Sequence, residues 1–213
     1  MKKIALFLVF LIFSLSPISA KPTPITLKTG INYTTSTYSA MNNYGQGFHI
    51  GAGTVIPIID KINIHADALY TFKKAKGKYS VSSWDEITLT LATSYIEIPV
   101  IINYTLSEDF SFYGGAYIGY LLSAAQKISN VPAVSIVRAG TINVKDSTEN
   151  TDYGIILGGA YTNSGWAFSG HYSLGLKDIM QGKDLAQKDI EGKLNSLTVS
   201  ISYSFLVDFK KRG

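Results

Sequence analysis

The chain has 213 residues, of which 46% are hydrophobic, and it carries a formal net charge of +4 and no cysteine. The absence of cysteine excludes both a disulfide framework and a lipid anchor on cysteine, so stability has to come from burial and from closure of the fold. Removing the two lysines of the N-terminal segment described next lowers the charge to +2 (4 − 2), and so small a charge does not suggest nucleic acid as a partner.

Residues 1–20 have the pattern of a cleaved signal peptide. Lys2 and Lys3 form a basic start, residues 4–15 are apolar, and Ala20 suits a cleavage site. The apolar run is too short for a transmembrane helix, which needs about 20 residues, and no later stretch is long enough. We therefore expect export, followed by a single mature domain at residues 21–213.

Eight later segments alternate apolar and polar residues, which predicts strands with one apolar face. They are Ile25–Tyr33, Gly47–Ile56, Lys61–Phe72, Ile87–Tyr104, Phe110–Ala124, Asp152–Tyr161, Trp166–Leu174 and Asn195–Phe205. In the fourth segment, Leu89 and Leu91 fall on the opposite phase to Ile96, which predicts a bulge or a change of partner near Thr93.

The last segment, Asn195–Phe205, is the most informative. Its apolar positions alternate strictly with serine and threonine, so one face is apolar and the other carries small hydroxyl groups without charge. An apolar outside around a polar inside is typical of a transmembrane β-barrel. The competing prediction is a soluble barrel of lipocalin type, in which the apolar face points inward.

The connections alternate in length. Short turns are expected at 57–60, 106–109 and 162–165, and longer polar loops at 34–46, 73–86, 125–151 and 175–194. Outer-membrane barrels have short periplasmic turns and long extracellular loops. The sequence therefore predicts an all-β fold, a single eight-stranded antiparallel up-and-down transmembrane β-barrel, with both termini periplasmic and aromatic girdles at the strand ends.

Two loop segments need separate interpretation. Ala133–Lys145 resembles a hairpin with arms too short to cross a membrane, so it is an extracellular hairpin or an extension of its neighbours, although ten strands stay an alternative. The lysines at 73, 74, 76 and 78 are interpreted as solvated loop charges, and the alternative is contact with anionic lipid phosphates.

Ionisable and amide side chains on the inner faces predict a structural polar network. Its main members are His49, His65, Asp67, Glu97, Asp152 and His171, accompanied by Lys28, Asn32, Asn63 and Asn103. A tight turn at 57–60 would place His49 near Asp67. We predict no catalytic, cofactor or metal-binding residue, because the histidines are not spaced as a ligand pair and no nucleophile elbow is present.

Several segments resemble a known family. Tyr95–Val100, Tyr113–Leu122, Asp152–Gly159, His171–Ile179 and Asn195–Phe205 are similar to the PorT-like outer-membrane β-barrel family of Bacteroidota, over nearly the whole mature chain. The resemblance implies an eight-stranded barrel in a Gram-negative outer membrane. It implies little about activity, although one member is associated with a secretion and maturation machinery.

Eight strands enclose an interior that side chains fill, so we expect no open pore. A structural or binding role is favoured, with residues 125–151 and 175–194 meeting an extracellular or lipopolysaccharide partner. Outer-membrane lipid is a further partner, and the oligomeric state stays open. The alternatives are a component that assists secretion or assembly, and a lipid A-modifying enzyme that uses His171, Ser173 and Glu97.

Overall fold

The structure is a computed structural model that describes residues 23–38, 41–80, 86–131, 138–180 and 192–207. Its strands are β1 (Thr23–Ser36), β2 (Asn43–Ile59), β3 (Ile62–Ser80), β4 (Glu86–Thr105), β5 (Phe110–Ser129), β6 (Gly140–Asn143), β7 (Thr151–Asn163), β8 (Trp166–Gly175) and β9 (Leu194–Val207). One 3₁₀ turn, η2, covers Lys145–Ser147. The predicted signal peptide lies outside the described residues. None of the helical segments described has the length and apolar character needed to span a membrane.

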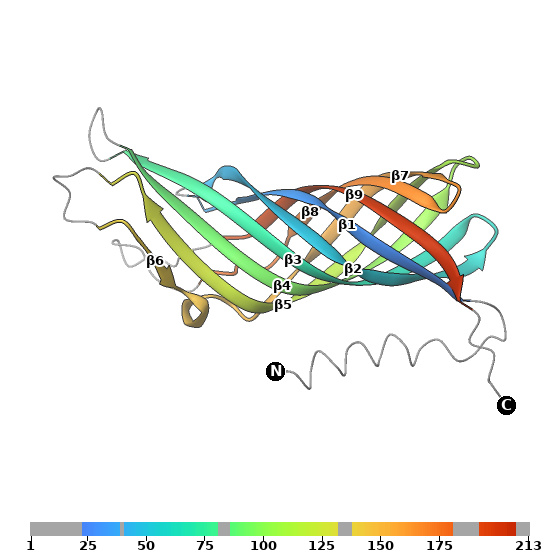
Figure 1. Cartoon of the computed structure of the whole chain (residues 1–213), viewed down its shortest axis with the longest axis horizontal. Coiled ribbons are helices and arrows are strands. Elements are labelled where there is room, and N and C mark those ends of the chain that lie inside the picture. The colour runs from blue at the N-terminus through green and yellow to red at the C-terminus, as the bar shows by residue number, and fades with distance from the viewer. Residues whose placement is uncertain (1–22, 39–40, 81–85, 132–137, 181–191, 208–213) are drawn as a thin grey trace.

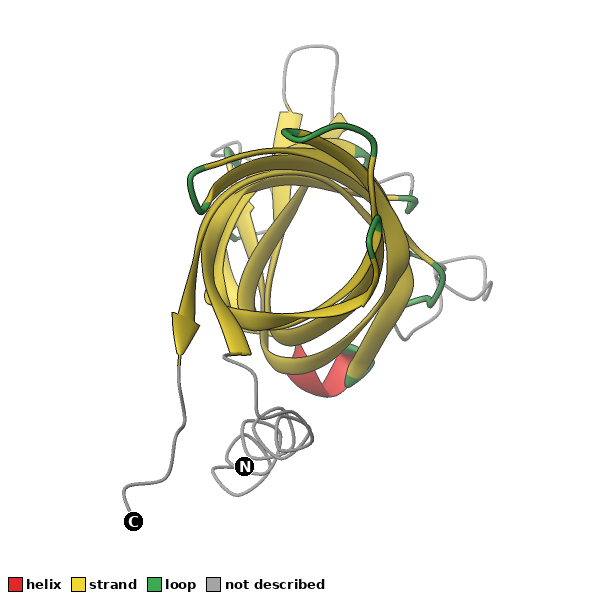
Figure 2. Ribbon diagram, turned by 90° about the vertical axis from the view of Figure 1, so that its right-hand side faces the viewer, coloured by secondary structure: helices red, strands yellow, loops and turns green. Residues whose placement is uncertain are grey.

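Eight of these strands close into one antiparallel ring. Neighbours in the chain pair with each other, β5 pairs with β7, and β9 pairs with β1 to complete the circle that Figure 2 shows end-on. The four-residue strand β6 stays outside the ring and extends β5 at Ala125–Ile128. The eight-stranded prediction is confirmed. β6 is the second arm of the predicted hairpin and pairs with the end of β5, and residues 133–137 of the first arm lie outside the described residues.

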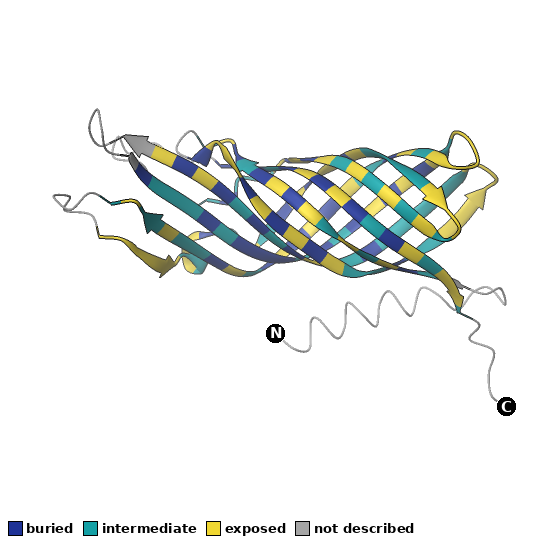
Figure 3. Ribbon diagram, turned by 45° about the horizontal axis from the view of Figure 1, so that its top comes forward, coloured by how far each residue is buried: buried dark blue, intermediate teal, exposed yellow. Residues whose placement is uncertain are grey.

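The apolar face of the barrel points outward. On β9, Ser200 is 3% exposed and Thr198 is 5% exposed, whereas Val199 between them is 53% exposed. Figure 3 shows the same alternation of buried and exposed positions along the strands of the ring. The arrangement therefore matches the inverted pattern of a membrane barrel and excludes the lipocalin-type alternative.

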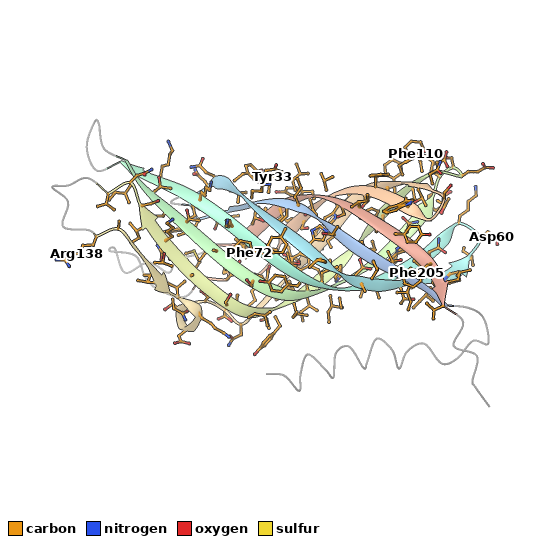
Figure 4. All side chains as sticks on the ribbon, viewed as in Figure 1. Tyr33, Asp60, Phe72, Phe110, Arg138 and Phe205 are labelled. Atoms are coloured by element: carbon orange, nitrogen blue, oxygen red, sulfur yellow. The ribbon has the colours of Figure 1, made fainter. Side chains whose placement is uncertain are left out.

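Large aromatic side chains form part of the outer face near both ends of the ring. Near the short turns the exposed ones are Tyr104, Phe110, Phe112, Trp166, Tyr203 and Phe205, and toward the long loops they are Tyr33, Tyr44, Phe48, Tyr70, Tyr120, Tyr153 and Tyr172. Figure 4 labels Phe110 and Phe205 at the first end, near Asp60, with Phe72 and Tyr33 lying toward the other. Two such groups are typical of the aromatic girdles at membrane interfaces.

Both ends of the described chain lie at the short-turn end, because Thr23 pairs with Val207. The β7–β8 connection there is a tight two-residue turn. Ser164 has φ 50° and Gly165 has φ 85°, which is the positive-φ pair that matches strand twist in a two-residue hairpin. The even strand count thus returns the chain to the side from which it started, as predicted.

The β2–β3 turn is shifted from its predicted place. Pro57 pairs within the sheet at a register shift, and the turn itself is Asp60 and Lys61. A proline without an N–H fits a bulge, which is why the strand continues through it. Moving the turn by two residues changes every partner by four, so His49 pairs with Thr71, and the register that would have paired His49 with Asp67 was wrong. The two side chains nevertheless line the same cavity in the lumen.

Strands β3, β4 and β5 are longer than the others, with 19, 20 and 20 residues against 10 in β8. Residues 73–80 and 125–129, which the sequence placed in loops, continue these strands, so that interpretation was wrong. We call residues 73–80, 86–94 and 123–129 the loop-end wall. In Figure 1 these strands reach beyond the rest of the ring, toward β6.

The bulge predicted near Thr93 is confirmed at the base of this wall. The register between β4 and β5 shifts between Ser94 and Tyr95, and Leu122 is the extra residue on β5. Leu91 nevertheless keeps the inward phase of Glu97, because the inner face changes from polar to apolar toward the loop end.

Candidate functional site in the barrel lumen

The centre of the lumen holds a buried ion cluster. Lys73 on β3 lies with its Nζ 2.5 Å from a carboxylate oxygen of Glu97 on β4 and 3.3 Å from one of Asp152 on β7. The three residues are 3%, 9% and 0% exposed, respectively. Tyr117 on β5 donates its hydroxyl to Asp152 at 3.3 Å. Removing such charges from water is costly, and here the two carboxylates share one ammonium group, with the Tyr117 hydroxyl as a further donor to Asp152.

Aromatic rings surround the ammonium group of this cluster. The Lys73 Nζ lies 4.9 Å from the ring centroid of Tyr117 and 5.3 Å from that of Tyr95. A cation at this distance from a ring face is attracted by the negative face of the π system. The cluster therefore joins four strands, β3, β4, β5 and β7, across the interior.

A second set of polar contacts lines the same cavity as the ion cluster. Lys28 on β1 forms an ion pair with Asp67 on β3. The Nε2 of His49 is 3.0 Å from the Ser200 hydroxyl, and the Nδ1 of His171 is 3.2 Å from the Tyr113 hydroxyl. These contacts connect β1 to β3, β2 to β9, and β5 to β8.

The structure brings most of the predicted polar residues together. His49, Asp67, Glu97 and His171 line one cavity of about 50 Å³, and Asp152 is joined to it through Lys73. His65 is apart from this group. It lies in a separate cavity of about 280 Å³ toward the short turns, with Asn63, Asn103 and hydroxyl groups from most of the strands.

Lys73 was predicted to lie in a solvated loop and was absent from the predicted polar network. That interpretation was wrong because β3 continues to Ser80 and the residue falls on the inner face. A signal was present in the sequence: the inward positions Asn63, His65 and Asp67 continue with period two to residue 73.

An apolar cluster packs across the lumen at the loop end. It consists of Met41, Ala75, Leu91, Tyr95, Leu121, Ala124, Ile179 and Leu194. Tyr95, Leu121 and Ile179 are each 0% exposed. The described lumen is therefore asymmetric, with a packed apolar cluster toward the long loops, the ion cluster in the middle, and the larger cavity toward the short turns.

The residues of the enzymatic alternative line the same small cavity. His171, Ser173 and Glu97 all face it, but the hydrogen-bond partner of His171 is the Tyr113 hydroxyl. A nucleophile and its base need to be within hydrogen-bond reach of each other. Among the described residues, no group of three or more histidine, aspartate or glutamate side chains is placed to hold a metal ion.

Comparisons with known proteins give a family match and several similar structures. The model of the outer membrane protein beta-barrel domain matches residues 20–181. The structure is similar to that of Neisserial surface protein A, with 13% identity over 85% of this chain and 97% of the other and a TM-score of 0.49. No curated protein sequence matches the chain.

Two further similar structures differ in what they do. One is Ail, the attachment invasion locus protein of Yersinia pestis, in complex with the heparin analogue sucrose octasulfate, with 12% identity over 86% and 99% of the two chains and a TM-score of 0.45. The other is the outer membrane protease OmpT of Escherichia coli, with 10% identity over 89% and 99% and a TM-score of 0.46.

Proposed function

Since the chain belongs to the outer membrane protein beta-barrel domain family, we propose that it is a closed-lumen barrel with a binding surface at its long-loop end. It is an integral outer-membrane β-barrel protein, and family members of this kind place their long loops outside the cell. Our proposal includes the removal of residues 1–20 as a signal peptide and a place in the PorT-like branch of Bacteroidota.

The packing of the lumen is the observation that supports a closed barrel. The ion cluster around Lys73 occupies the middle of the interior, and the apolar cluster around Tyr95 and Leu121 lies above it toward the loops. The cavity beside the ion cluster is only about 50 Å³. Eight-stranded barrels are filled by their side chains, whereas porins of 16–18 strands leave a channel.

Conductance in planar lipid bilayers tests this part of the proposal. Purified wild-type protein should give no stable single-channel steps, because ions would have to displace both clusters. The double variant Tyr95→Ala with Leu121→Ala should show small, unsteady currents, since it removes two of the large buried apolar side chains at the loop end. Large, stable steps from the wild-type protein would contradict a closed lumen.

The binding part of the proposal is supported by contacts that order the loop end. The segments at 140–150 and 176–180 are connected by a bridge between Thr148 and Met180 and by an ion pair of Lys177 with Glu149 at 3.0 Å. The backbone N–H of Glu149 also donates to the carbonyl of Ile179 at 2.8 Å. Recognition residues commonly lie on loops that a rigid scaffold holds in place.

Photo-crosslinking on intact cells tests where the partner binds. A photoreactive amino acid at Arg138, which lies at the loop end in Figure 4, should give a specific crosslink to an extracellular or lipopolysaccharide partner. The same amino acid at Asp60, in a short turn, is the matched control and should not give that product. The same crosslink from both positions would contradict a loop-end binding surface.

We also propose that the protein is not an enzyme. Ser173 and Glu97 are 6% and 9% exposed and face the lumen, whereas lipid contacts the outer face of the ring. The alternative is lipid A modification, which mass spectrometry of lipid A from cells with and without the gene tests directly. A changed acyl pattern that His171→Ala abolishes would establish the enzyme in place of our proposal.

A further inference from the structure

The outer face of the loop-end wall carries a group of lysines. Lys74, Lys76 and Lys78 occupy alternate positions on β3, so they share the outward face. Lys76 is directly opposite Thr90 on β4, which is directly opposite Lys127 on β5. We call these four residues the lysine face. Lys76, Lys78 and Lys127 are exposed, and Lys74 is partly exposed.

The spacing of the lysine face follows from sheet geometry. Successive outward residues on a strand are about 6.6 Å apart, and strands two apart are separated by about 9.6 Å. Within residues 74–78, 86–92 and 123–129, which carry this face, the one acidic residue is Glu86, at the start of β4 and two residues from Thr88, the register partner of Lys78. Lys74, Lys76 and Lys127 lie farther from Glu86 in the register, and these three are the lysines on which the inference rests.

The height of the lysine face relative to the membrane follows from β3. Its outward residues are apolar or aromatic from Ile62 to Phe72, which is 11 residues and the length a tilted strand needs to cross the hydrocarbon layer. With about 3.3 Å per residue and a tilt of about 40°, each residue rises about 2.5 Å along the membrane normal. Lys74, about 5 Å above Phe72, then lies in the headgroup layer, which is about 5–7 Å thick. Lys76, about 10 Å above Phe72, lies just outside that layer and reaches it through its long side chain, and Lys78 lies about 5 Å farther out.

The aromatic residue next to this face supports the same placement. The Lys74 Nζ lies 5.1 Å from the ring centroid of Phe72, and Phe72 itself packs against Phe48 on β2. Aromatic rings mark the interface between hydrocarbon and headgroups, and cations directly above them meet the phosphates of that layer. The outward residues of β3 thus change from apolar to basic between Phe72 and Lys74.

We propose that the lysine face binds the phosphate groups of lipopolysaccharide in the outer leaflet. This inference rests on the proposed function, because it takes the long-loop end to be the extracellular end. Lipid A phosphates lie at the height derived above and carry the complementary charge, and a row of lysines suits phosphates as a set of point charges. The barrel would thereby hold a shell of lipopolysaccharide on the side of β3, β4 and β5.

Binding of defined lipids to the purified barrel tests this inference. Native mass spectrometry would compare bisphosphorylated lipid A, dephosphorylated lipid A and phosphatidylglycerol as probes. We expect the tightest binding for bisphosphorylated lipid A. The triple variant Lys74→Gln, Lys76→Gln, Lys127→Gln should lose about 100-fold in affinity, because each lysine at such a surface contributes about fivefold.

A single substitution with a matched control shows whether the effect is specific to the lysine face. Lys76→Gln should weaken binding about fivefold. Lys61→Gln removes an exposed lysine from the β2–β3 turn at the opposite end and should leave binding unchanged. Each variant is first shown to keep the heat-modifiable gel shift of a folded barrel. Equal affinity for dephosphorylated lipid A or phosphatidylglycerol, or an equal loss in the Lys61 variant, would overturn the inference.

The outcome is separate from that of the proposed function. If the lysine face does not bind lipid A while bilayer recordings show no conductance, the closed barrel stands and only the identity of the partner is wrong. If wild-type protein conducts while lipid A binding depends on Lys74, Lys76 and Lys127, the lipid inference stands and the closed-lumen proposal is wrong.

Discussion

Replacing Lys73 by methionine is the most direct test of how the lumen is held together. The substitution keeps a long unbranched side chain but removes the charge between Glu97 and Asp152, which lie 2.5 and 3.3 Å from the ammonium group. Two buried carboxylates then face each other without a cation. Breaking a buried pair by removing one partner costs about 3–5 kcal/mol, which is about a 150- to 4,000-fold change in the folding equilibrium.

A second substitution should recover part of this loss. In Lys73→Met with Glu97→Gln, the amide replaces one carboxylate, and Asp152 keeps the hydroxyl of Tyr117 as a donor. We expect the double variant to be more stable than Lys73→Met alone, because it removes the repulsion between two like charges.

Urea titrations of folding into lipid vesicles, followed by the heat-modifiable gel shift, would measure these free energies. Lys74→Met is the matched control, since it makes the same change at the next residue, on the outer face. Its ammonium group rests over the Phe72 ring, and such exposed contacts contribute only about 0.5–1 kcal/mol. Equal losses for the two substitutions would refute the assignment of Lys73 to a buried ion cluster.

Three further predictions concern the ring, and the same titrations measure them. Ile201→Arg should lower the free energy of unfolding by about 2–4 kcal/mol, and Leu197→Arg, near the loop-end aromatics, should lower it by about 1 kcal/mol or less. Equal losses would contradict the assignment of these residues to the lipid-facing side. Gly154→Ala should destabilise the barrel because the added methyl group would lie 2.9 Å from a backbone carbonyl carbon of β8, while Gly170→Ala, with no atom nearer than 3.8 Å, should be tolerated. Tyr117→Phe should cost about 1–3 kcal/mol by leaving a buried carboxylate without its hydroxyl donor, and an unchanged midpoint would argue against that hydrogen bond.

The sequence was sufficient to predict the ring and which face of each strand points outward. In a closed sheet, the alternation in Asn195–Phe205 determines which residues point outward, because shifting the strand by one residue would exchange its two faces. The register of β2 against β3 was not predictable in the same way. It depends on the position of the turn, and Pro57 suggested a turn where the strand in fact continues.

The candidate site was only partly predictable for a related reason. Inward polar residues such as Asp67 and Glu97 could be identified from their phase, but their partners depend on contacts across the lumen between strands that are not neighbours. Lys73 was assigned to the outside because it opens a run of basic residues, and local charge outweighed strand phase in that interpretation. The apolar cluster at the loop end was missed because Met41 and Ile179 lie outside the strands.

The length of β3, β4 and β5 has a consequence for how the protein reaches its membrane. In the proposed orientation, with the long-loop end outside the cell, every lysine of the lysine face has to traverse the hydrocarbon layer once, because the chain enters from the periplasmic side. A lysine at the bilayer midplane costs about 2–4 kcal/mol, so four crossing together would raise the insertion barrier by about 8–16 kcal/mol. Unaided insertion into pure lipid should therefore be slow, and the rate should depend on these lysines even though, once assembled, they never lie within the hydrocarbon.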